Sequence, residues 1–424
     1  MAIPGKIIPL TFMAFSALSA CAGPPESSPR PLARGSAPVA DPIPPTDAAT
    51  EARFESWLAG FKSRALANGI TEYTWNRAMA DVRYNPKVIE RDRYQSEFTK
   101  SIWDYLDSAV SDERVATGKQ MLRQYGPQLD AIERKYGVDK EVVVAIWGME
   151  SRYGAYRGKT AIIPALATLA YDGRRGEFFA KQLIAALKII QSGDVDARHM
   201  TGSWAGAMGH TQFIPTSYLS YAVDFTGDGR RDIWSEDPTD ALASTAAYLA
   251  RSGWSKGQPW GVEVILPSGF NYGLTGKGTK KSPADWAALG VRSATGGTVP
   301  NYGSASILVP AGAKGPAFMI FGNFRAISRY NSADSYVIGV GHLSDRLKGK
   351  GPFVQDWPRT GKPLNSKQKV ELQERLTAAG FDTDGTDGKV GANTSKAIVA
   401  FQKSRGLPPD GYATLELLQV LRGS

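Results

Sequence analysis

The sequence predicts an α+β protein that is mainly α-helical, and three observations carry this prediction. Apolar residues recur at helix spacing from about residue 54 to residue 253. Between about residues 261 and 324 the pattern changes to short alternating or apolar runs separated by glycine and proline, which is typical of a small β subdomain. A helical segment over about residues 333–347 closes this part, and residues 365–424 form a separate unit with the pattern of three short helices.

The N-terminus has the pattern of an export signal. Lys6 precedes an apolar segment over residues 7–18, which is too short to span a bilayer but suits the core of a secretory signal peptide. This segment runs into LSAC, which resembles the lipobox of bacterial lipoproteins and ends in Cys21, the only cysteine. The resemblance implies that residues 1–20 are removed and that Cys21 carries lipid, which leaves no cysteine for an internal disulfide. Ala22, in place of an aspartate, implies a periplasmic protein anchored to the outer membrane of a Gram-negative bacterium.

Residues 21–50 are rich in proline and contain no aromatic residue, which predicts an extended, disordered tether. At about 3.1 Å per residue, a tether of about 30 residues reaches on the order of 90 Å. The whole chain carries a formal net charge of +9, which favours a polyanionic partner. Because no segment resembles a nucleic-acid-binding module, we expect acidic polymers of the cell envelope and no nucleic acid.

A glutamate stands at the end of the apolar run VVVAIWGMESRYG. A helix that begins directly after an Asp139 cap would place Glu150 on a face that should be buried, together with Val143, Ile146 and Trp147. Removing an ionised carboxylate from water is costly, so such a group either pairs with a cation or has a raised pKa.

Two interpretations of Glu150 therefore stay open on this stretch alone. A carboxyl group that keeps its proton near neutral pH can act as a general acid. Alternatively, Glu150 forms a structural ion pair with Arg152 or Arg157.

A second dense motif, GSWAGAMGHTQFIPTSY, covers residues 202–218. Its glycines and alanines let backbones approach closely, while Ser203, Gln212 and Tyr218 supply uncharged hydrogen-bonding groups. Such a surface suits a neutral sugar ring, although a tight helix–helix contact is an equal alternative.

Together, ES-x-YG after an apolar helix and the glycine-rich motif some fifty residues later resemble the lytic murein transglycosylases of the B type. The resemblance covers roughly residues 51–347. It implies a lysozyme-like, mostly helical catalytic domain with a deep groove, which cuts the MurNAc-GlcNAc bond of peptidoglycan without a cofactor. The single catalytic glutamate of the family matches Glu150.

The resemblance also implies a set of substrate-binding residues. Arg174 and Arg175, in LAYDGRRGEFF, match an arginine pair suited to the acidic stem peptide. For each aromatic residue the alternative is core packing, which we favour for Tyr105. The implied groove residues are Ser203, Gln212, Phe213, Tyr248, Tyr330, Asn331, Tyr336 and Tyr105.

The implied reaction needs one carboxyl group instead of the two that ordinary glycosidases use. Glu150 would donate a proton to the leaving GlcNAc oxygen while the N-acetyl group of MurNAc stabilises the anomeric carbon. The carboxylate would then take the proton of the MurNAc 6-hydroxyl, giving a 1,6-anhydro sugar. Two alternatives are a true hydrolase, with Asp172 or Glu177 as second carboxylate, and a non-catalytic tether between membrane and wall.

Residues 224–240, DFTGDGRRDIWSEDPTD, resemble a calcium loop of the EF-hand kind. Ser235 stands where the closing glutamate is expected, and the B-type enzymes use a later aspartate there. An Asp-Gly turn without metal is an equal alternative. The three histidines of the chain are too few and too scattered to indicate a transition-metal site. The implied ligands of a structural Ca²⁺ are Asp224, Thr226, Asp228, the carbonyl of Arg230 and Asp240.

The C-terminal unit, residues 365–424, has apolar residues at helix spacing and two Asp-Gly turns. It resembles the three-helix peptidoglycan-binding module of many wall enzymes, whereas the alternative is a generic helical hairpin. The segment before this unit, residues 348–364, has the composition of a flexible linker and includes most of the stretch GKGPFVQDWPRTGKPLN. We thus expect glycan strands and stem peptides of peptidoglycan as partners, and the membrane through lipid.

Overall fold

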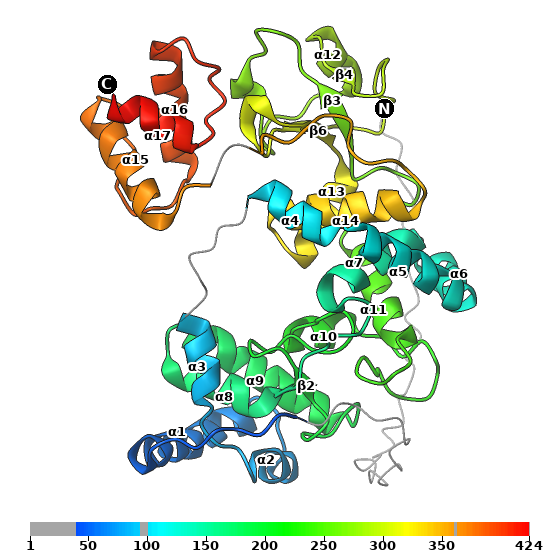
Figure 1. Ribbon diagram of the computed structural model, residues 1–424. Helices are drawn as coiled ribbons and strands as arrows, with labels where there is room; N and C mark the ends of the chain where they lie inside the picture. The colour runs from blue at the N-terminus through cyan, green and yellow to red at the C-terminus, as the bar shows by residue number, and fades with distance from the viewer. Residues whose placement is uncertain (1–39, 94–100, 360–362, 424) are drawn as a thin grey trace, which may run out of the picture. The chain divides into compact units, whose positions relative to one another are not determined.

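The computed structural model describes residues 40–93, 101–359 and 363–423 (Figure 1). The predicted signal peptide, the lipidation site Cys21 and residues 21–39 of the predicted tether lie outside these ranges. Within them, none of the helices is both long enough and apolar enough to cross a membrane.

A first helical lobe packs around Phe54, Leu183 and Phe213, all nearly inaccessible to solvent. Its first helix begins earlier than the predicted domain start at residue 51, because Asp47 caps it by accepting from the Thr50 amide at 2.8 Å. The Asp41 amide also donates to the Lys159 carbonyl, so the end of the predicted tether contacts the fold. The helices of this lobe are α1 (Ala48–Ala67), α2 (Glu72–Met79), α3 (Pro86–Arg93), α8 (Ile162–Asp172), α9 (Gly176–Gln191) and α10 (Pro215–Tyr221).

A second helical lobe surrounds α7 (Lys140–Ser151). Residues 142–148 of α7 are all buried. The helix α14 (Asp334–Leu347) packs along α7, and it is the closing helix that the sequence predicts near residues 333–347. The other helices of this lobe are α4 (Ile102–Ala109), α5 (Asp112–Gln124), α6 (Gly126–Tyr136), α11 (Thr239–Arg251) and α13 (Gly322–Tyr330).

The predicted β subdomain is a four-stranded antiparallel sheet in the order β4-β3-β6-β5. Gly261 pairs with Ile320 at one end of the central ladder. The Trp286 side chain is fully buried against the sheet, and its indole donates to the Ala305 carbonyl. The elements are β3 (Gly261–Ile265), α12 (Pro283–Ala288), β4 (Arg292–Ser293), β5 (Ser306–Leu308) and β6 (Ala317–Ile320), with the 3₁₀ helices η1 (Tyr272–Leu274) and η2 (Gly312–Lys314).

The segment after α14 is not the free linker that its composition predicts. The Phe353 ring stacks on His342 at 3.8 Å between ring centroids and contacts Phe318 of β6. The amides of Val354 and Gln355 both donate to the Glu263 carboxylate of β3. Residues 351–359 therefore bind to the β subdomain, because their aromatic side chains find an apolar surface that sequence composition does not reveal.

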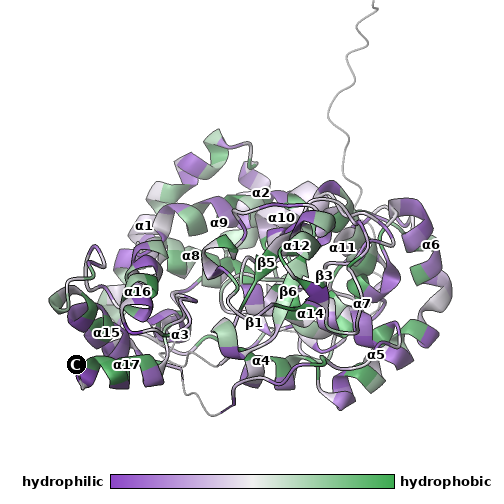
Figure 2. Ribbon diagram, turned by 90° about the horizontal axis from the view of Figure 1, so that it is seen from above, coloured by the Kyte–Doolittle hydropathy of each residue, from purple (hydrophilic) through white to green (hydrophobic). Residues whose placement is uncertain are grey.

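The C-terminal unit consists of α15 (Ser366–Ala378), α16 (Ala392–Ser404) and α17 (Leu415–Arg422), as predicted. Its helices are amphipathic, with both hydrophobic and hydrophilic stretches (Figure 2), and they enclose Leu372, Phe401 and Leu418. The Asp410 carboxylate in the turn before α17 accepts from the Ala313 amide of η2 at 2.7 Å. The fold is thus α+β and mainly helical, as the sequence predicts.

Candidate active site

Glu150 lies in the last turn of α7, where the backbone geometry ends the helix. Arg152 and Tyr153 both adopt left-handed conformations, with φ of 48° and 58°, which turn the chain away from the helix axis. The helix begins at Lys140 as expected, but Asp139 does not cap it with its side chain. Instead, the Asp139 carboxylate binds the Lys348 ammonium at 2.9 Å and accepts from the Trp254 indole, contacts between segments far apart in the sequence.

The Glu150 carboxyl group is partly accessible and has one hydrogen-bond partner among the described residues, the Tyr336 hydroxyl. Tyr336 Oη donates to Glu150 Oε1 at 2.5 Å. Burial raises the pKa of Glu150 to about 7, although the hydrogen bond from Tyr336 lowers it. Glu150 can therefore hold a proton near neutral pH.

The predicted ion-pair alternative for Glu150 is wrong. The Arg157 guanidinium binds the Glu236 carboxylate at 2.5 Å and donates to the Trp234 and Ser235 carbonyls. The Arg152 guanidinium stacks over the Tyr156 ring at 5.3 Å. Neither arginine compensates the charge of Glu150.

Aromatic side chains from four segments gather near this carboxyl group. Tyr330 packs against the cores of both lobes, and its ring centroid lies 5.8 Å from that of Phe213 and 4.9 Å from that of Tyr248. Burial raises the pKa of Tyr105 to about 12, and the charge of Glu150 adds to this, which places Tyr105 within electrostatic reach of the acid. Tyr105 is also partly buried in the second lobe, as the core-packing interpretation requires.

The polar side chains of the glycine-rich motif mostly form hydrogen bonds with backbone groups in or near the motif. Gln212, at a left-handed φ of 55°, donates to the carbonyls of Arg157 and Gly209. Ser203 Oγ accepts from the Ala207 amide at 3.0 Å. Both side chains remain partly accessible, whereas Tyr218 is fully buried and donates to a backbone carbonyl, so its expected contribution to a sugar-binding surface is wrong. Asn331 is exposed and accepts from the Ala333 amide.

The glycines of this motif allow the close backbone approach that their composition predicts. β1 (Thr160–Ala161) pairs with β2 (Thr201–Gly202), which joins the segment after α7 to the motif. A Cβ atom on Gly158 would lie 2.2 Å from the Gly202 carbonyl carbon, and one on Gly202 would lie 2.1 Å from the Ala207 oxygen. The two motifs that indicated the family thus meet in space.

Arg174 and Arg175 lie in the first lobe, and both bind the same buried partner. Arg174 Nε lies 2.9 Å and Arg175 Nη2 3.0 Å from the Asp92 carboxylate, whose side chain is almost inaccessible. The guanidinium groups themselves stay about half exposed. Sequence reasoning missed Asp92, because nothing in RDRYQ distinguishes it from a surface carboxylate.

The predicted calcium loop brings three of its carboxylates together. Oxygen atoms of Asp224, Asp228 and Asp240 lie within 4.8 Å of one another. Asp240 is 3% exposed, and its pKa is raised by burial and by the charge of Asp224, even though three backbone amides donate to it. Crowded carboxylates of this kind are the oxygen donors that Ca²⁺ prefers, so these residues fit the ion. Thr226 Oγ1 adjoins the cluster through Asp224, at 3.4 Å.

The carboxylates suggested for a hydrolase are both committed elsewhere. Asp172 binds Arg93 at 3.0 Å, and Glu177 binds Arg64 at 2.7 Å and has a lowered pKa because of that hydrogen bond. Neither residue fits the role of a second catalytic carboxylate.

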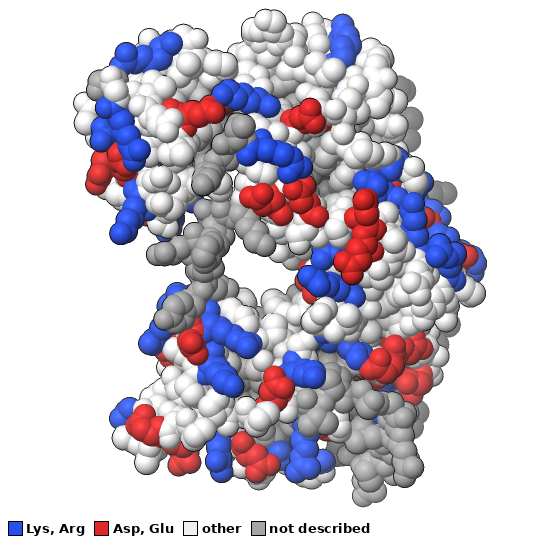
Figure 3. Space-filling model, viewed as in Figure 1, with Lys and Arg blue, Asp and Glu red and all other residues white. Residues whose placement is uncertain are grey.

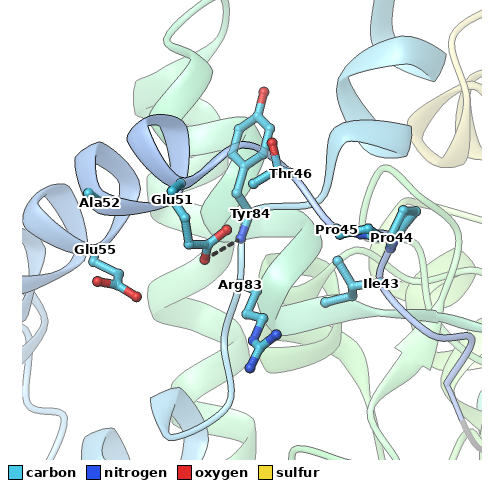
Figure 4. A pocket seen from close by; sticks show the side chains of 10 residues that line it. Ile43, Pro44, Pro45, Thr46, Glu51, Ala52, Glu55, Arg83 and Tyr84 are labelled. Carbon is cyan, nitrogen blue, oxygen red and sulfur yellow. Dashed lines mark hydrogen bonds between the residues drawn. The ribbon is translucent and has the colours of Figure 1, made fainter.

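The surface is hollowed between the two helical lobes, and basic and acidic side chains border the opening (Figure 3). A separate pocket of about 660 Å³ lies between the start of α1 and the segment before α3, where the Tyr84 amide donates to Glu51 (Figure 4). None of the residues that line this pocket is a predicted site residue.

The fold and the partly buried Glu150, which has no cation beside it among the described residues, define a lysozyme-like enzyme that cleaves glycosidic bonds. The chain belongs to the transglycosylase SLT domain family, whose model matches residues 53–345. Residues 365–421 match the peptidoglycan binding domain family. The resemblance drawn from the two motifs is thereby confirmed.

Known relatives agree with this assignment. SltB3 from Pseudomonas aeruginosa, solved in complex with NAG-anhNAM-pentapeptide and with NAG-NAM-pentapeptide, is 51% identical with a TM-score of 0.84, over 87% of this chain and 99% of that chain. The Escherichia coli lytic transglycosylase Slt35, solved with calcium, is 30% identical with a TM-score of 0.59, over 71% of this chain and 94% of that one. Membrane-bound lytic murein transglycosylase B of Escherichia coli is 36% identical over 250 residues, which span 57% of this chain and 66% of that protein.

Proposed function

We propose that this protein is a lytic transglycosylase that cuts the β-1,4 bond between MurNAc and GlcNAc in peptidoglycan and leaves 1,6-anhydroMurNAc ends, for remodelling or turnover of the wall. The observation that carries the proposal is the Glu150 carboxyl group, whose pKa is raised to about 7 and which has no carboxylate or arginine partner among the described residues. A group with this pKa can serve first as acid and then as base at neutral pH.

The hydrogen bond from Tyr336 suggests how the two oxygens of Glu150 divide their roles. Oε1 accepts from the Tyr336 hydroxyl, so Oε2 is the oxygen that carries the proton. Protonated Oε2 gives its proton to the leaving GlcNAc oxygen while the N-acetyl group of MurNAc stabilises the anomeric carbon. The carboxylate, now charged and stabilised by Tyr336, removes the proton of the 6-hydroxyl as that oxygen bonds to the anomeric carbon.

We further propose which residues hold the substrate. Tyr105, Tyr330 and Tyr248 form the aromatic wall, while the predicted groove residue Phe213 is 2% exposed and packs behind Tyr248 and Tyr330. The accessible polar groups of Ser203, Gln212 and Asn331 bind hydroxyl and acetamido groups. The half-exposed Arg174 and Arg175 receive the carboxylates of the stem peptide, because Asp92 neutralises only one of their two charges.

We also propose roles for the domains, the carboxylate cluster and the N-terminal segment. We propose residues 51–347 as the catalytic domain, with α1 extending it to Ala48, and residues 365–424 as a wall-binding module. Ca²⁺ bound by Asp224, Asp228 and Asp240, with Thr226 and the Arg230 carbonyl, would neutralise the crowded carboxylates beside α11. A lipid on Cys21 and a tether over residues 21–47 would hold the enzyme at the periplasmic face of the outer membrane.

Product mass tests the proposed reaction. Purified protein is incubated with peptidoglycan, and the products are separated and weighed. The proposal predicts muropeptides each one water lighter than the hydrolytic product and non-reducing at MurNAc. Reducing ends that appear in step with cleavage would identify a hydrolase instead.

A further inference from the structure

His210, in the middle of the glycine-rich motif, is 4% exposed, and both of its ring nitrogens have partners. The Trp147 indole Nε1 donates to Nδ1 at 3.2 Å. Nε2 lies 2.7 Å from the Ser235 carbonyl oxygen, which can only accept. The pair of contacts therefore assigns the proton to Nε2 and leaves Nδ1 as acceptor.

The surroundings keep this ring neutral. Burial lowers the pKa of His210 to about 4; the hydrogen bond to the Ser235 carbonyl opposes this, the charge of Arg157 adds to it, and the charges of Glu236 and Asp232 oppose it more weakly. The Arg157 guanidinium, 3.2 Å from Nε2, donates to the Ser235 carbonyl at 2.8 Å instead. A neutral ring with the proton on Nε2 satisfies every one of these contacts.

The backbone of His210 reaches the same helix as its ring. Ser151 Oγ donates to the His210 carbonyl at 2.5 Å and accepts from the Gly154 amide. A Cβ atom on Gly154 would lie 2.6 Å from His210 Nδ1, so the ring rests directly on the backbone after α7. These contacts hold α7 at Trp147 and Ser151, on both sides of Glu150 in the sequence.

On its other side, His210 is joined to the segment that lies between Asp228 and Asp240 of the carboxylate cluster. The Asp232 carboxylate accepts from the amides of Trp234 and Ser235, at 2.8 and 3.0 Å. The Asp232 amide in turn donates to Asp240 at 3.0 Å. A continuous series of hydrogen bonds thus runs from Asp240 through Ser235 and His210 to α7.

We propose that His210 is a positioning residue for Glu150. His210 fixes the last turn of α7 against residues 232–235, and the Glu150 carboxyl group therefore meets Tyr336 in the orientation that proton transfer needs. The proposal rests on the proposed role of Glu150 as the acid. A misplacement of about 1 Å at a reacting group can cost on the order of 10²-fold in rate, which sets the size of the expected effect.

Three variants test this role: His210→Phe, which removes both ring nitrogens, His210→Gln, which keeps an N–H donor toward Ser235, and His199→Phe as control. His199 is a surface histidine paired with Asp196. We expect kcat on soluble glycan fragments to fall 10- to 100-fold in His210→Phe, with KM within about twofold of wild type. His210→Gln should recover part of kcat, and His199→Phe should match wild type. Glycan binding by His210→Phe in a Glu150→Gln background should equal that of Glu150→Gln alone.

Several results would overturn the proposal. One is a kcat of His210→Phe equal to that of wild type. A second is a loss of kcat in His210→Phe no larger than its unfolded fraction, measured by circular dichroism. A third is the same kcat in His210→Phe and His210→Gln. Should His210→Phe fail to fold, Trp147→Phe removes the donor to Nδ1 together with part of a buried indole ring, and its folded fraction must show a lower kcat with an unchanged KM. Full activity of Glu150→Gln would instead contradict the proposed function, independently of any His210 result.

Discussion

Two carboxyl groups, Glu150 at the end of α7 and Asp194 after α9, are both withdrawn from water but differ in their partners. Asp194 receives the Arg231 guanidinium at 2.6 Å and the Ser192 hydroxyl at 2.6 Å. Burial alone would raise its pKa, but these hydrogen bonds and the charge of Arg231 prevail and lower it. Glu150 has only the neutral Tyr336 hydroxyl among the described residues, and burial raises its pKa to about 7. The absence of a cation thus separates an acid that can transfer a proton from one that only stabilises the fold.

The largest expected effect is on turnover. Glu150→Gln keeps the shape of the side chain but cannot transfer a proton, so kcat should fall by about 10² to 10⁴, the range typical of general acid–base catalysis. Binding to sacculi should survive, because the groove is otherwise unchanged. Asp194→Asn is the matched control at the other carboxyl group, and its folded fraction should retain kcat. An equal loss in both variants would remove the distinction between them.

The stability of the two variants should change in opposite directions. Asp194→Asn removes the negative charge that compensates Arg231 and should cost about 3 kcal/mol at pH 7. Because the folded pKa of Asp194 is lowered, its contribution is present at neutral pH and is lost as the pH falls through that lowered value. Denaturant unfolding at pH 7 and pH 3 checks both statements, and a cost that is independent of pH would contradict the second.

Glu150→Gln should instead stabilise the protein as the pH rises. The folded state holds the proton of Glu150 more tightly than the unfolded state, so its stability falls between the ordinary pKa near 4.5 and about 7. The variant lacks this loss and should gain up to about 3 kcal/mol over wild type at pH 8, with little difference at pH 4. Unfolding curves that differ equally at both pH values would argue against a raised pKa.

Asp240 offers an intermediate case, a buried carboxylate whose neighbours are other carboxylates. Calcium bound only by the folded state should raise the unfolding free energy by about 2.7 kcal/mol at a hundredfold excess over Kd. Melting curves with calcium and with chelator measure this, and Asp240→Asn should reduce the difference. Identical wild-type curves at millimolar calcium would leave only the Asp-Gly turn interpretation.

The smallest effect is expected at the hydrogen bond from Tyr336. Since the Tyr336 hydroxyl favours the charged form of Glu150, Tyr336→Phe should raise the pKa of the acid further. The alkaline limb of the pH profile of kcat, where Glu150 loses its proton, should therefore move to higher pH. A shift to lower pH would mean that Tyr336 stabilises the protonated acid instead.

Local sequence patterns predicted much of the secondary structure but few of the long-range contacts. The helix around Glu150 and the convergence of Asp224, Asp228 and Asp240 follow from spacing within short segments. The bond from Tyr336 joins residues 186 positions apart, and no periodicity encodes such a contact. The packing of residues 351–359 against the β subdomain could not be predicted for the same reason, because the burial of an aromatic residue depends on the surface that it contacts.

The partners of polar side chains were the least predictable part of the site. Asp139 has the sequence of a helix cap, but a stronger partner, Lys348, takes its carboxylate. His210 stood out in the sequence only as the single histidine of the glycine-rich motif, and this alone did not indicate a role. Which hydrogen bonds a side chain makes depends on all groups that packing brings near it, and these are known only from the three-dimensional structure.

The most direct test of the central claim is the titration of Glu150 itself. The carboxyl carbon of Glu150 is followed by ¹³C NMR across pH 3 to 9, with Glu150→Gln used to assign the resonance. A partly buried acid without a cation beside it predicts a midpoint near 7 in the free protein. A midpoint at or below the ordinary value near 4.5 would show a paired or solvated carboxylate, and would contradict the assignment of Glu150 as the acid.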